Sequence, residues 1–507
     1  DYTKVDKKPL EDMMRACKGL QDLPPTDPKT FFVLGGLHGE PFRGAGWGNN
    51  SYWGGYCNHG NVLFPTWHRV YLLKLEEALQ SIPGCQDVML PYWDETSDDS
   101  LQNGIPWALT QETFPLDEVT IPNPLRSFVF NHKIQDFING DNPNYGKPKG
   151  YETVRYPLSG LVGSPDDLAA TEKHNALYPN YDDNVKLLDQ NVIAWLTSTI
   201  VVDGQTISTS VKTKYVNCLD APNYTVFSNT TSAVQWNADR GSGVPQVVPL
   251  ESPHNDIHLS VGGFDVPAVF DASPIAGANG DMGENDTAGL DPIFYFHHCF
   301  VDRMFWLWQK KNGFTDHLHV IEEYPGTNSV DNQGPTPGVA PNSWLTLDSP
   351  LNPFKNKHGE TYTSRHCVNI EKQLGYTYGP GSLDEYVEPS AAAALKEGHS
   401  TKMIRVTGIN RAAIRGSFLV SAFANIDGKR YHVGTESVLS RWSVQGCANC
   451  QTHLEVKAFI GLHSFREESL TNASYEVEVR TRDGVLNQHR SPALSAFQKE
   501  SFHVEVR

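Results

Sequence analysis

A chain of 507 residues with 39% hydrophobic and 11% aromatic side chains can bury a large core and exceeds the usual size of one domain. Its 59 acidic and 41 basic residues give a net charge of -18, which would repel a phosphate backbone or an anionic membrane and argues against nucleic acid and lipid as partners. No apolar run approaches the roughly 18 residues of a membrane-spanning helix, and the sequence opens on a polar stretch rather than a signal peptide, so we expect a soluble, already processed protein.

Eight cysteines and a set of N-x-S/T sequons favour a secreted, extracellular protein. The cysteines are too sparse for a disulfide-built miniprotein but sufficient for a few bridges in an oxidising compartment, and we expect one between Cys17 and Cys85. Sequons are used only in the secretory pathway. They lie at Asn49, Asn223, Asn229, Asn285 and Asn472.

Three segments in the first three quarters of the chain have helical patterns, and each carries histidine. They are residues 67–81, 252–261 and 291–311. The third is apolar around most of its circumference, so we expect it to cross the core. Asp291 can cap its free N–H groups, with Pro292 in its first turn. Loops rich in Gly, Pro, Asn and Asp separate the helices, which predicts one large, loop-rich domain over residues 1–380.

The character of the sequence changes near residue 380. Residues 381–400 are polar and then Ala-rich, without the aromatic side chains found before them, which is typical of a linker. Residues 401–507 contain short runs with strand-like alternation, separated by turn residues such as Asp-Gly. The runs are residues 403–409, 417–426, 430–438, 453–462, 475–482 and 502–507. This succession of short strands predicts an all-β sandwich.

One group of histidines combines the two later helices. His254 and His258 are four residues apart, so both imidazoles lie on one face of a helix and can share a metal. The HxxxH pattern alone is weak, because surface or packing histidines are an equal alternative. Asn255 replaces the glutamate that would complete a zinc-protease HExxH motif.

The long apolar helix offers the third imidazole of this group. Its adjacent histidines, His297 and His298, project about 100 degrees apart, so only one of them can face a given site. Phe294 and Asp302, each four residues from His298, share its face. Two hydrogen-bonded core histidines are the alternative when this helix is considered alone.

A second group lies nearer the N-terminus and consists of His38, His59 and His68. Their spacing is irregular, but nearby glycines let the backbone approach closely, and Phe64 and Trp67 supply an apolar wall. Two clusters of three imidazoles without a thiolate or carboxylate favour copper, zinc, iron or nickel. Three histidines leave an open position on each metal, so two facing sites can hold dioxygen between them.

These residues lie in motifs that resemble the type-3 copper proteins, the family of tyrosinases, catechol oxidases (polyphenol oxidases) and molluscan haemocyanins. The motifs are LHGEPF, C-x-H-G followed by FP-x-WHR, LPYWD, PHNDIHLSVGG, DPIFYFHHCFVDR and the YTY of residues 376–378. The resemblance implies a mainly α core, in which a four-helix bundle with long loops holds two copper ions. It assigns the first copper to His38, His59 and His68 and the second to His254, His258 and His298.

The resemblance also implies roles for residues around the coppers. Cys57 matches a cysteine that forms a thioether with a histidine ligand, here His59, although a disulfide is the alternative. Phe294 matches the aromatic side chain over the second copper's ligands. Asn255 and Glu251 match the pair proposed in some tyrosinases to orient a water that accepts the phenolic proton; the alternative is that Asn255 caps a helix or faces solvent and Glu251 ends a loop.

Two further expectations concern neighbours of the ligands. His297 is expected beside the second site without binding its copper, and Asp302 is expected to form a structural ion pair with Arg303. The offset of Asn285 from His298 places it near the pocket mouth, so we expect its sequon to be unused.

The C-terminal residues 401–507 resemble, more weakly, the domain that shields the active site in many latent phenol oxidases of fungal type. An apolar side chain of this domain is expected to plug the pocket, and Val438, Leu439 and Trp442 are the candidates. Cys447 and Cys450 form a CANC sequence similar to a cysteine pair linked to copper loading in some fungal members. A local disulfide is an equal alternative for that pair.

The implied activity is the oxidation of o-diphenols (catechols) to o-quinones with O2, by a latent monomer or weak oligomer whose partners are small phenols. The sequence leaves open whether monophenols are hydroxylated as well. A haemocyanin-like reversible O2 carrier is the rival, although such carriers usually chain several units whereas this polypeptide holds one. A hydrolytic dizinc enzyme is disfavoured by the lack of bridging carboxylates.

Overall fold

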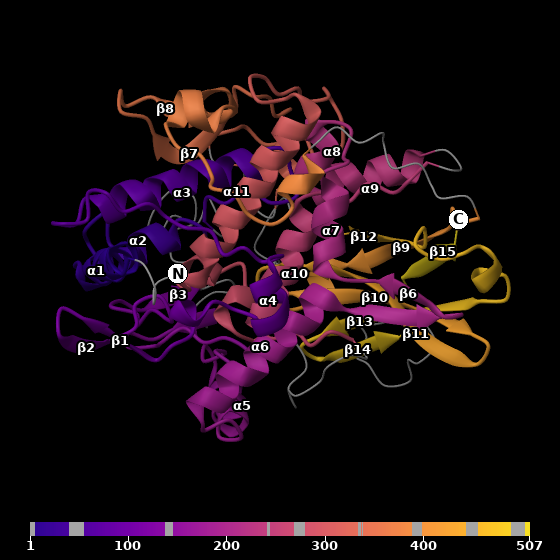
Figure 1. Ribbon diagram of the computed structural model, residues 1–507, viewed down its shortest axis with the longest axis horizontal. Helices are drawn as coiled ribbons and strands as arrows, with labels where there is room; N and C mark the ends of the chain where they lie inside the picture. Colours follow the sequence, from indigo (N-terminus) through magenta and orange to yellow (C-terminus); the bar gives the residue numbers. More distant parts are fainter. Residues whose placement is uncertain are drawn as a thin grey trace.

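The computed structural model describes residues 6–39, 55–136, 145–240, 244–267, 279–332, 336, 338–387, 398–442, 455–487 and 502–506. A helical core is followed by a β-rich C-terminal region, and the two lie side by side (Figure 1). This arrangement confirms the predicted class of each part of the chain. Within the described residues, no helix is both long and apolar enough to cross a membrane.

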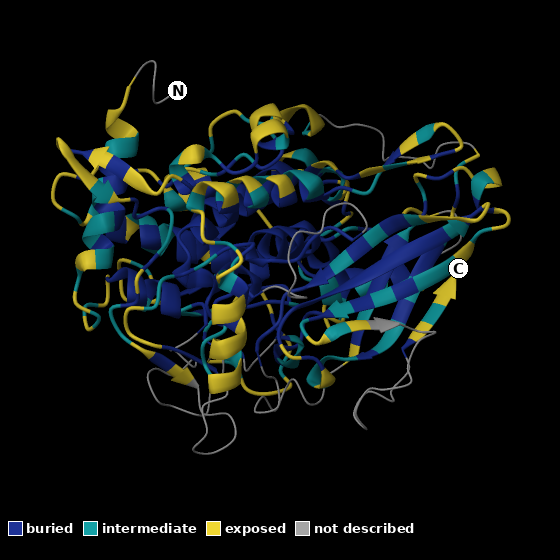
Figure 2. Ribbon diagram, turned by 90° about the horizontal axis from the view of Figure 1, so that it is seen from below, coloured by how far each residue is buried: buried dark blue, intermediate teal, exposed yellow. Residues whose placement is uncertain are grey.

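Four helices pack together in the core, and three of them carry histidines. They are α3 (Phe64–Gln80), α6 (Tyr181–Thr197), α10 (Glu251–Gly262) and α11 (Ile293–Asn312). Helix α3 packs against α11, and α10 packs against both α6 and α11. Residues 293–309 of α11 are all buried, as its apolar circumference predicts. Figure 2 shows these central ribbons buried, while the outer helices expose one side.

The remaining elements of the core are shorter. Its other helices are α1 (Lys8–Asp22), α2 (Phe31–Gly36), α4 (Asp98–Asn103), α5 (Pro165–Asn175), α7 (Val211–Cys218), α8 (Tyr224–Ser228) and α9 (Thr230–Asp239). Its antiparallel hairpins are β1 (Thr113–Leu116) with β2 (Val119–Pro122), β3 (Ile134–Asp136) with β4 (Tyr145–Lys147), β5 (Thr199–Val202) with β6 (Gln205–Ser208), and β7 (Pro350–Lys355) with β8 (Thr361–Thr363).

The three helices predicted around the histidines are present, with ends shifted by one to three residues. Helix α3 begins at Phe64 rather than at residue 67, because Pro65 suits the first helical turn. Asp291 accepts a hydrogen bond from the Ile293 amide at 3.2 Å, as a cap should. The same carboxylate also binds the Arg155 guanidinium at 2.6 Å, which ties the start of α11 to a loop of the core.

The C-terminal region contains two antiparallel sheets. The strand orders are β11-β10-β13-β14 and β12-β9-β15. The strands are β9 (Met403–Asn410), β10 (Phe418–Ile426), β11 (Lys429–Val438), β12 (Glu455–Gly461), β13 (Ser474–Thr481), β14 (Gly484–Asn487) and β15 (His503–Val506). Strand β14 was not predicted. Both sheets share one apolar cluster, to which the β5–β6 hairpin of the core adds Val202 and Ile207, so the core and the sheets are packed together.

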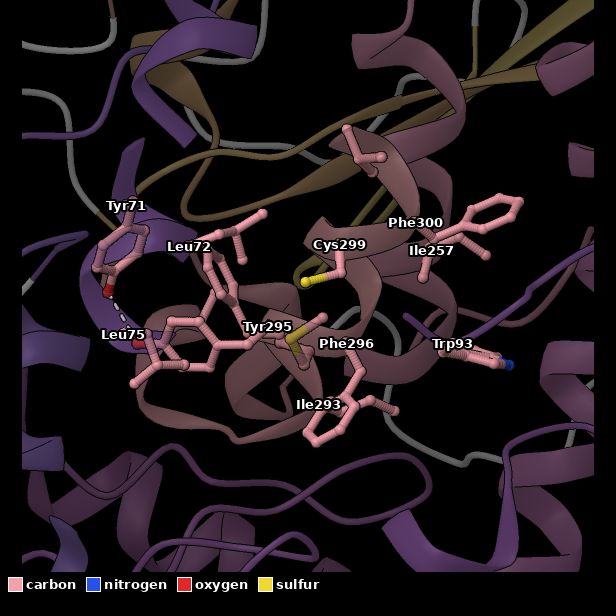
Figure 3. Close-up of a cluster of buried hydrophobic side chains, with 14 of the residues drawn as sticks. Tyr71, Leu72, Leu75, Trp93, Ile257, Ile293, Tyr295, Phe296, Cys299 and Phe300 are labelled. Carbon is pink, nitrogen blue, oxygen red and sulfur yellow. Dashed lines mark hydrogen bonds between the residues drawn. The ribbon is translucent and has the colours of Figure 1, made fainter. Parts of the chain in front are cut away.

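The apolar side chains of α3, α10 and α11 form the centre of the core (Figure 3). The figure labels Tyr71, Leu72, Leu75, Trp93, Ile257, Ile293, Tyr295, Phe296, Cys299 and Phe300. Tyr71 and Tyr295 join α3 to α11 through a hydrogen bond of 2.9 Å between their hydroxyl groups. Each buried hydroxyl therefore has a partner, as burial of a polar group requires.

The expected ion pair between Asp302 and Arg303 is wrong. Adjacent side chains on a helix project about 100 degrees apart, so these two reach different neighbours. Asp302 accepts hydrogen bonds from Arg69 Nε at 2.6 Å and from the hydroxyl groups of Tyr376 and Tyr378 at 2.6 and 2.7 Å. The YTY motif therefore helps to hold α3 and α11 together.

Arg303 instead fixes the start of the segment assigned to the linker. Its guanidinium binds Asp384 at 2.6 Å and donates to the Ser382 carbonyl at 2.8 Å. Residues 381–387 thus contact the core, while residues 388–397 lie outside the described residues.

The predicted bridge between Cys17 and Cys85 is also wrong. All six described cysteines are buried free thiols: Cys17, Cys57, Cys85, Cys218, Cys299 and Cys367. Burial raises the pKa of the Cys17 thiol to about 12, so it stays protonated. Cys447 and Cys450 lie outside the described residues. The cysteines that can be seen therefore give no support for an oxidising compartment.

The sequons differ in exposure. Asn472 is exposed, whereas Asn229 and Asn285 are fully buried and cannot carry a glycan in the folded chain. The side chain of Asn223 caps α8 by accepting from the Val226 amide at 3.1 Å. Asn49 lies outside the described residues.

We predict that Asp302→Ala lowers the free energy of unfolding by about 3–5 kcal/mol, because Arg69 would keep its charge in the core without a carboxylate. The measurement is urea unfolding followed by circular dichroism. Asp348→Ala is the control, since Asp348 pairs with Arg365 on the surface and its loss should change little. Equal effects of the two substitutions would contradict the anchoring role of Asp302.

Candidate metal centre

Seven buried histidines meet where α3, α10 and α11 come together, and each is at most 3% exposed. They are His38 after α2, His59 before α3, His68 on α3, His254 and His258 on α10, and His297 and His298 on α11. The fold therefore brings all six predicted ligands to one place, with His297 beside them.

The ring nitrogens of the second group converge on one point. His298 Nε2 lies 3.2 Å from His254 Nε2 and 3.3 Å from His258 Nε2. Three nitrogens that bind one ion at about 2.0–2.1 Å with tetrahedral angles lie about 3.3 Å apart. The three imidazoles are therefore spaced as a metal site requires.

Hydrogen bonds fix which nitrogen of each helical histidine faces the centre. Nδ1 of His258 donates to the Met282 carbonyl at 2.8 Å, and Nδ1 of His68 donates to the Phe64 carbonyl at 2.8 Å. A carbonyl can only accept, so the proton stays on Nδ1 and Nε2 keeps a free lone pair. Such hydrogen bonds orient metal-binding imidazoles in many metalloproteins.

The first group is built around His38 and His59. The ligand atoms of His38, Cys57 and His59 all lie within 4.8 Å of one another. Both ring nitrogens of His38 and of His59, and Nε2 of His68, are buried without a hydrogen-bond partner among the described residues. Buried polar atoms are rarely left in this state, so one nitrogen of each of these rings fits a metal as its missing partner.

Glycines allow the backbone to close around this group, as the sequence predicted. A Cβ atom on Gly35 would lie 2.5 Å from the Gly289 carbonyl oxygen, and one on Gly39 would lie 2.3 Å from the Asp286 carbonyl oxygen. Any other residue at these two positions would force the segment that carries His38 away from the core.

Aromatic rings separate the two groups from water. Phe294 stacks on His298 at 4.1 Å between ring centroids and meets His38 edge-on at 4.8 Å, so it touches both groups. Phe64 contacts His68 and His254 at 4.9 and 4.8 Å. Phe294 and Phe64 therefore lie where the sequence analysis expected them.

Burial keeps the imidazoles neutral. It lowers the pKa of His68 to about 3 and the pKa values of His38, His59, His254, His258 and His298 well below the ordinary value. Neutral imidazole is the form that binds a metal ion.

His297 has a partner that sequence reasoning missed. Its Nδ1 lies 2.6 Å from Oε1 of Glu95, whose Oε2 accepts from the Tyr215 hydroxyl at 2.7 Å. Burial lowers the pKa of His297 to about 3 and raises that of Glu95. The position of Glu95 directly after the LPYWD motif was the available indication.

Comparison with known proteins settles the family. Residues 28–311, more than half of the chain, match the common central domain of tyrosinase. The chain belongs to the tyrosinase family. It is therefore a polyphenol oxidase, an oxidoreductase that uses O2. The family implies a dinuclear copper centre, with which the two histidine groups are compatible.

Individual relatives extend this likeness over nearly the whole chain. The enzyme is 54% identical to tyrosinase HcTyr2 of a Hahella species, over 95% of this chain and 90% of the relative. It is 45% identical to a tyrosinase of Aspergillus oryzae, over 94% and 92% of the two chains. A solved tyrosinase from Burkholderia thailandensis matches with a TM-score of 0.86 and 52% identity, over 100% of this chain and 98% of that one.

A cavity of about 630 Å³ reaches His59 of this enzyme. His59, Glu251 and Asn255 line it from the core, and Val438 and Leu439 line it from the C-terminal region. The structure thus places Glu251 and Asn255 in one cavity beside a predicted copper ligand.

Both polar side chains already have partners in this cavity. Glu251 accepts from the Gly60 and Thr230 amides at 2.7 and 2.8 Å, and these bonds oppose the upward pKa shift that burial causes. Asn255 Oδ1 accepts from His254 Nδ1 at 3.0 Å, while Nδ2 donates to the Ser437 carbonyl at 3.2 Å. Neither the capping role nor the solvent-facing role considered for Asn255 fits these contacts.

We predict that His298→Ala halves the copper that the protein retains after dialysis, because it removes the imidazole that meets both His254 and His258. Elemental analysis measures the copper, and circular dichroism checks folding. His358→Ala, at an exposed histidine, is the control and should retain the full amount. Full retention by His298→Ala would exclude His298 as a ligand.

We predict that the copper-free protein loses stability as pH falls below about 6.5, the pKa of an unfolded histidine. The unfolded chain then binds protons that neutral, buried His68 does not accept until about pH 3. Between pH 6.5 and 5 this one group accounts for about 2 kcal/mol. Thermal unfolding at several pH values should show a shallower loss in His68→Gln, and identical pH profiles would contradict the assignment.

Proposed function

We propose that this enzyme oxidises o-diphenols to o-quinones with O2, using two copper ions. His38, His59 and His68 would hold the first, and His254, His258 and His298 the second. The observation that carries the proposal is the contact between the two groups, in which the ring of His68 stacks on that of His298 at 4.5 Å. When bound, the copper pair supplies the electron transfer between phenol and dioxygen.

The protein's own residues would position the phenol and handle its proton. Phe64 and Phe294 keep water away from the imidazoles. We propose that Asn255 and Glu251 hold the water that accepts the phenolic proton, which would allow hydroxylation of monophenols as well. Asn255 Nδ2 donates one of its two hydrogens to the Ser437 carbonyl, so the other hydrogen is left for this water.

A thioether between Cys57 and His59 is a further part of this proposal. The Cys57 thiol is buried next to the His38 and His59 rings, and no described cysteine competes for it as a disulfide partner. Bond formation joins sulfur to a ring carbon and releases two protons and two electrons, which dioxygen accepts. Such a bond would hold His59 in place on its loop.

We propose that the enzyme is latent while its C-terminal region is in place. Leu439 is 1% exposed, packs into the core's apolar cluster and lines the cavity, so it is the preferred plug. The Arg415 and Arg482 guanidinium groups lie over the Trp442 ring at 5.0 and 4.9 Å from its centroid, which suits an anchor better than a plug. Val438 lines the cavity beside Leu439.

Ion pairs would hold the region in this position. The pairs are Lys214 with Glu436 at 3.5 Å, Arg441 with Asp286 at 3.4 Å, and Arg482 with Glu284 at 3.0 Å. In this interpretation residues 1–380 are the catalytic domain with α3, α6, α10 and α11 as its four-helix bundle, residues 381–400 the linker, and residues 401–507 a sandwich that shields the site. We also propose that the enzyme is secreted and that it is a monomer or a weak oligomer.

We predict that the copper-loaded full-length enzyme consumes oxygen slowly with a simple catechol, and at least tenfold faster after limited proteolysis within residues 381–400. Leu439→Ala should raise uptake without cleavage, because it removes the plug but keeps the region attached. Lys357→Ala is the control, because it changes an exposed residue that does not line the cavity. If the copper-loaded enzyme consumes no oxygen before or after cleavage, the oxidase proposal is overturned and reversible O2 binding is favoured.

A further inference from the structure

The β5–β6 hairpin belongs to the core by sequence but to the C-terminal region by its packing. It lies between α6 and α7, which are helices of the core. Val202 and Ile207 are buried in the apolar cluster of the two C-terminal sheets, not in the cluster that fills the core. Figure 1 shows β6 beside the strands of the C-terminal region, and β5 contacts β11. A cut within residues 381–400 therefore does not divide the chain into two separately packed bodies.

The hairpin has one apolar face and one exposed face. Ile200 pairs with Ile207, and Val202 pairs with Gln205, so these four side chains share a face. Ile200 packs against the same C-terminal cluster as its two buried neighbours. Val201, on the opposite face, is 55% exposed. The hairpin thus turns its apolar side toward the C-terminal sheets alone.

The turn of the hairpin fixes its two strands to each other. Asp203 and Gly204 form the two-residue loop, with φ angles of 50° and 74°. Positive φ at both positions is typical of the Asp-Gly turn that matches the twist of a hairpin. A two-stranded hairpin is only marginally stable by itself, so its apolar face depends on the sheets that cover it.

Hydrogen bonds attach the hairpin and the helix after it to the C-terminal region. Gln205 Nε2 donates to the Ser464 carbonyl at 3.2 Å. Lys214 Nζ, on α7, donates to the Thr435 carbonyl of β11 at 2.6 Å. Polar contacts therefore accompany the apolar packing on this side of the interface.

A second attachment lies before α10, at Gln246. Its Nε2 donates to the Phe459 carbonyl of β12 at 2.7 Å, and its amide donates to His463 Nε2 at 3.2 Å. Release of the C-terminal region must break these bonds and expose Val202 and Ile207 to water, which is unfavourable. These contacts do not involve residues 381–400, so a cut there leaves all of them in place.

We infer that the β5–β6 hairpin retains the C-terminal region on the core after residues 381–400 are cut, so that cleavage turns a tethered inhibitor into a dissociable one. The inhibition rests on the proposed latency, whereas the retention rests on the packing. Cleavage makes the association intermolecular, so the bound fraction depends on protein concentration. The rise in oxygen uptake expected after cleavage is therefore complete only when the cut enzyme is diluted.

The test uses the copper-free, full-length chain, in which a site-specific protease sequence replaces the four alanines of residues 391–394. Sedimentation velocity follows the two fragments over a dilution series after the cut. The wild-type fragments should sediment as one particle at micromolar concentration and separate on dilution. Ile207→Asp should weaken their association about a hundredfold, because it places a charge in the apolar cluster.

Val201→Asp is the matched control, because it places the same charge on the exposed face of the same hairpin, and it should leave the association unchanged. Val202→Ala removes buried methyl groups without adding a charge and should weaken the association about tenfold. It serves in place of Ile207→Asp if that chain does not fold. Circular dichroism of each uncut chain checks folding.

Separation of the wild-type fragments at micromolar concentration, or equal weakening by Val201→Asp and Ile207→Asp, would overturn the inference. Oxygen uptake by the copper-loaded, cut enzyme tests the inhibition separately. Uptake per molecule should rise on dilution, and in Val202→Ala it should rise at a higher protein concentration. Fragments that stay together while uptake is independent of dilution would remove the proposed latency and leave the hairpin as a binding surface.

Discussion

Burial of seven imidazoles at one point constrains the whole structure. An uncharged imidazole needs a hydrogen-bond acceptor for one nitrogen, and in a dry core that acceptor must come from the protein. The carbonyl groups of Phe64 and Met282, the side-chain oxygen of Asn255 and the carboxylate of Glu95 meet this need for four of the rings. Nε2 of His298 faces Nε2 of His254 and of His258 at 3.2 and 3.3 Å, an arrangement that suits a metal ion between them.

The ring stack of His68 on His298 depends on the alignment of α3 with α11. Asp302 fixes this alignment by binding Arg69 of α3 and two tyrosines near the end of the core. The Tyr71–Tyr295 hydrogen bond adds a second tie one turn away from the site. Both ties are buried and polar, so they resist sliding of one helix along the other more strongly than apolar packing would.

Local periodicity made much of the site predictable from the sequence. The spacing of His254 and His258, the apolar circumference of α11 and the alternation in the C-terminal strands each follow from a repeat of a few residues. Contacts between distant segments leave no such pattern. The contact of Glu95 with His297 was therefore missed, and Asp302 was paired with its sequence neighbour although three distant residues bind it. The disulfide expectation failed because cysteine number says little about which thiols meet.

The Asn255 side chain contacts the C-terminal region and also lines the cavity proposed to bind the phenol. The Ser437 carbonyl of β11 accepts one amide hydrogen of Asn255, and Val438 and Leu439 of the same region line the cavity beside it, so the region and a bound phenol would compete for the same space. Thermodynamic reciprocity then applies: whatever factor docking of the region takes from ligand affinity, the ligand takes from docking. In the proposed latent enzyme, an abundant phenol would by itself loosen the C-terminal region, so the enzyme would become easier to activate where its substrate accumulates.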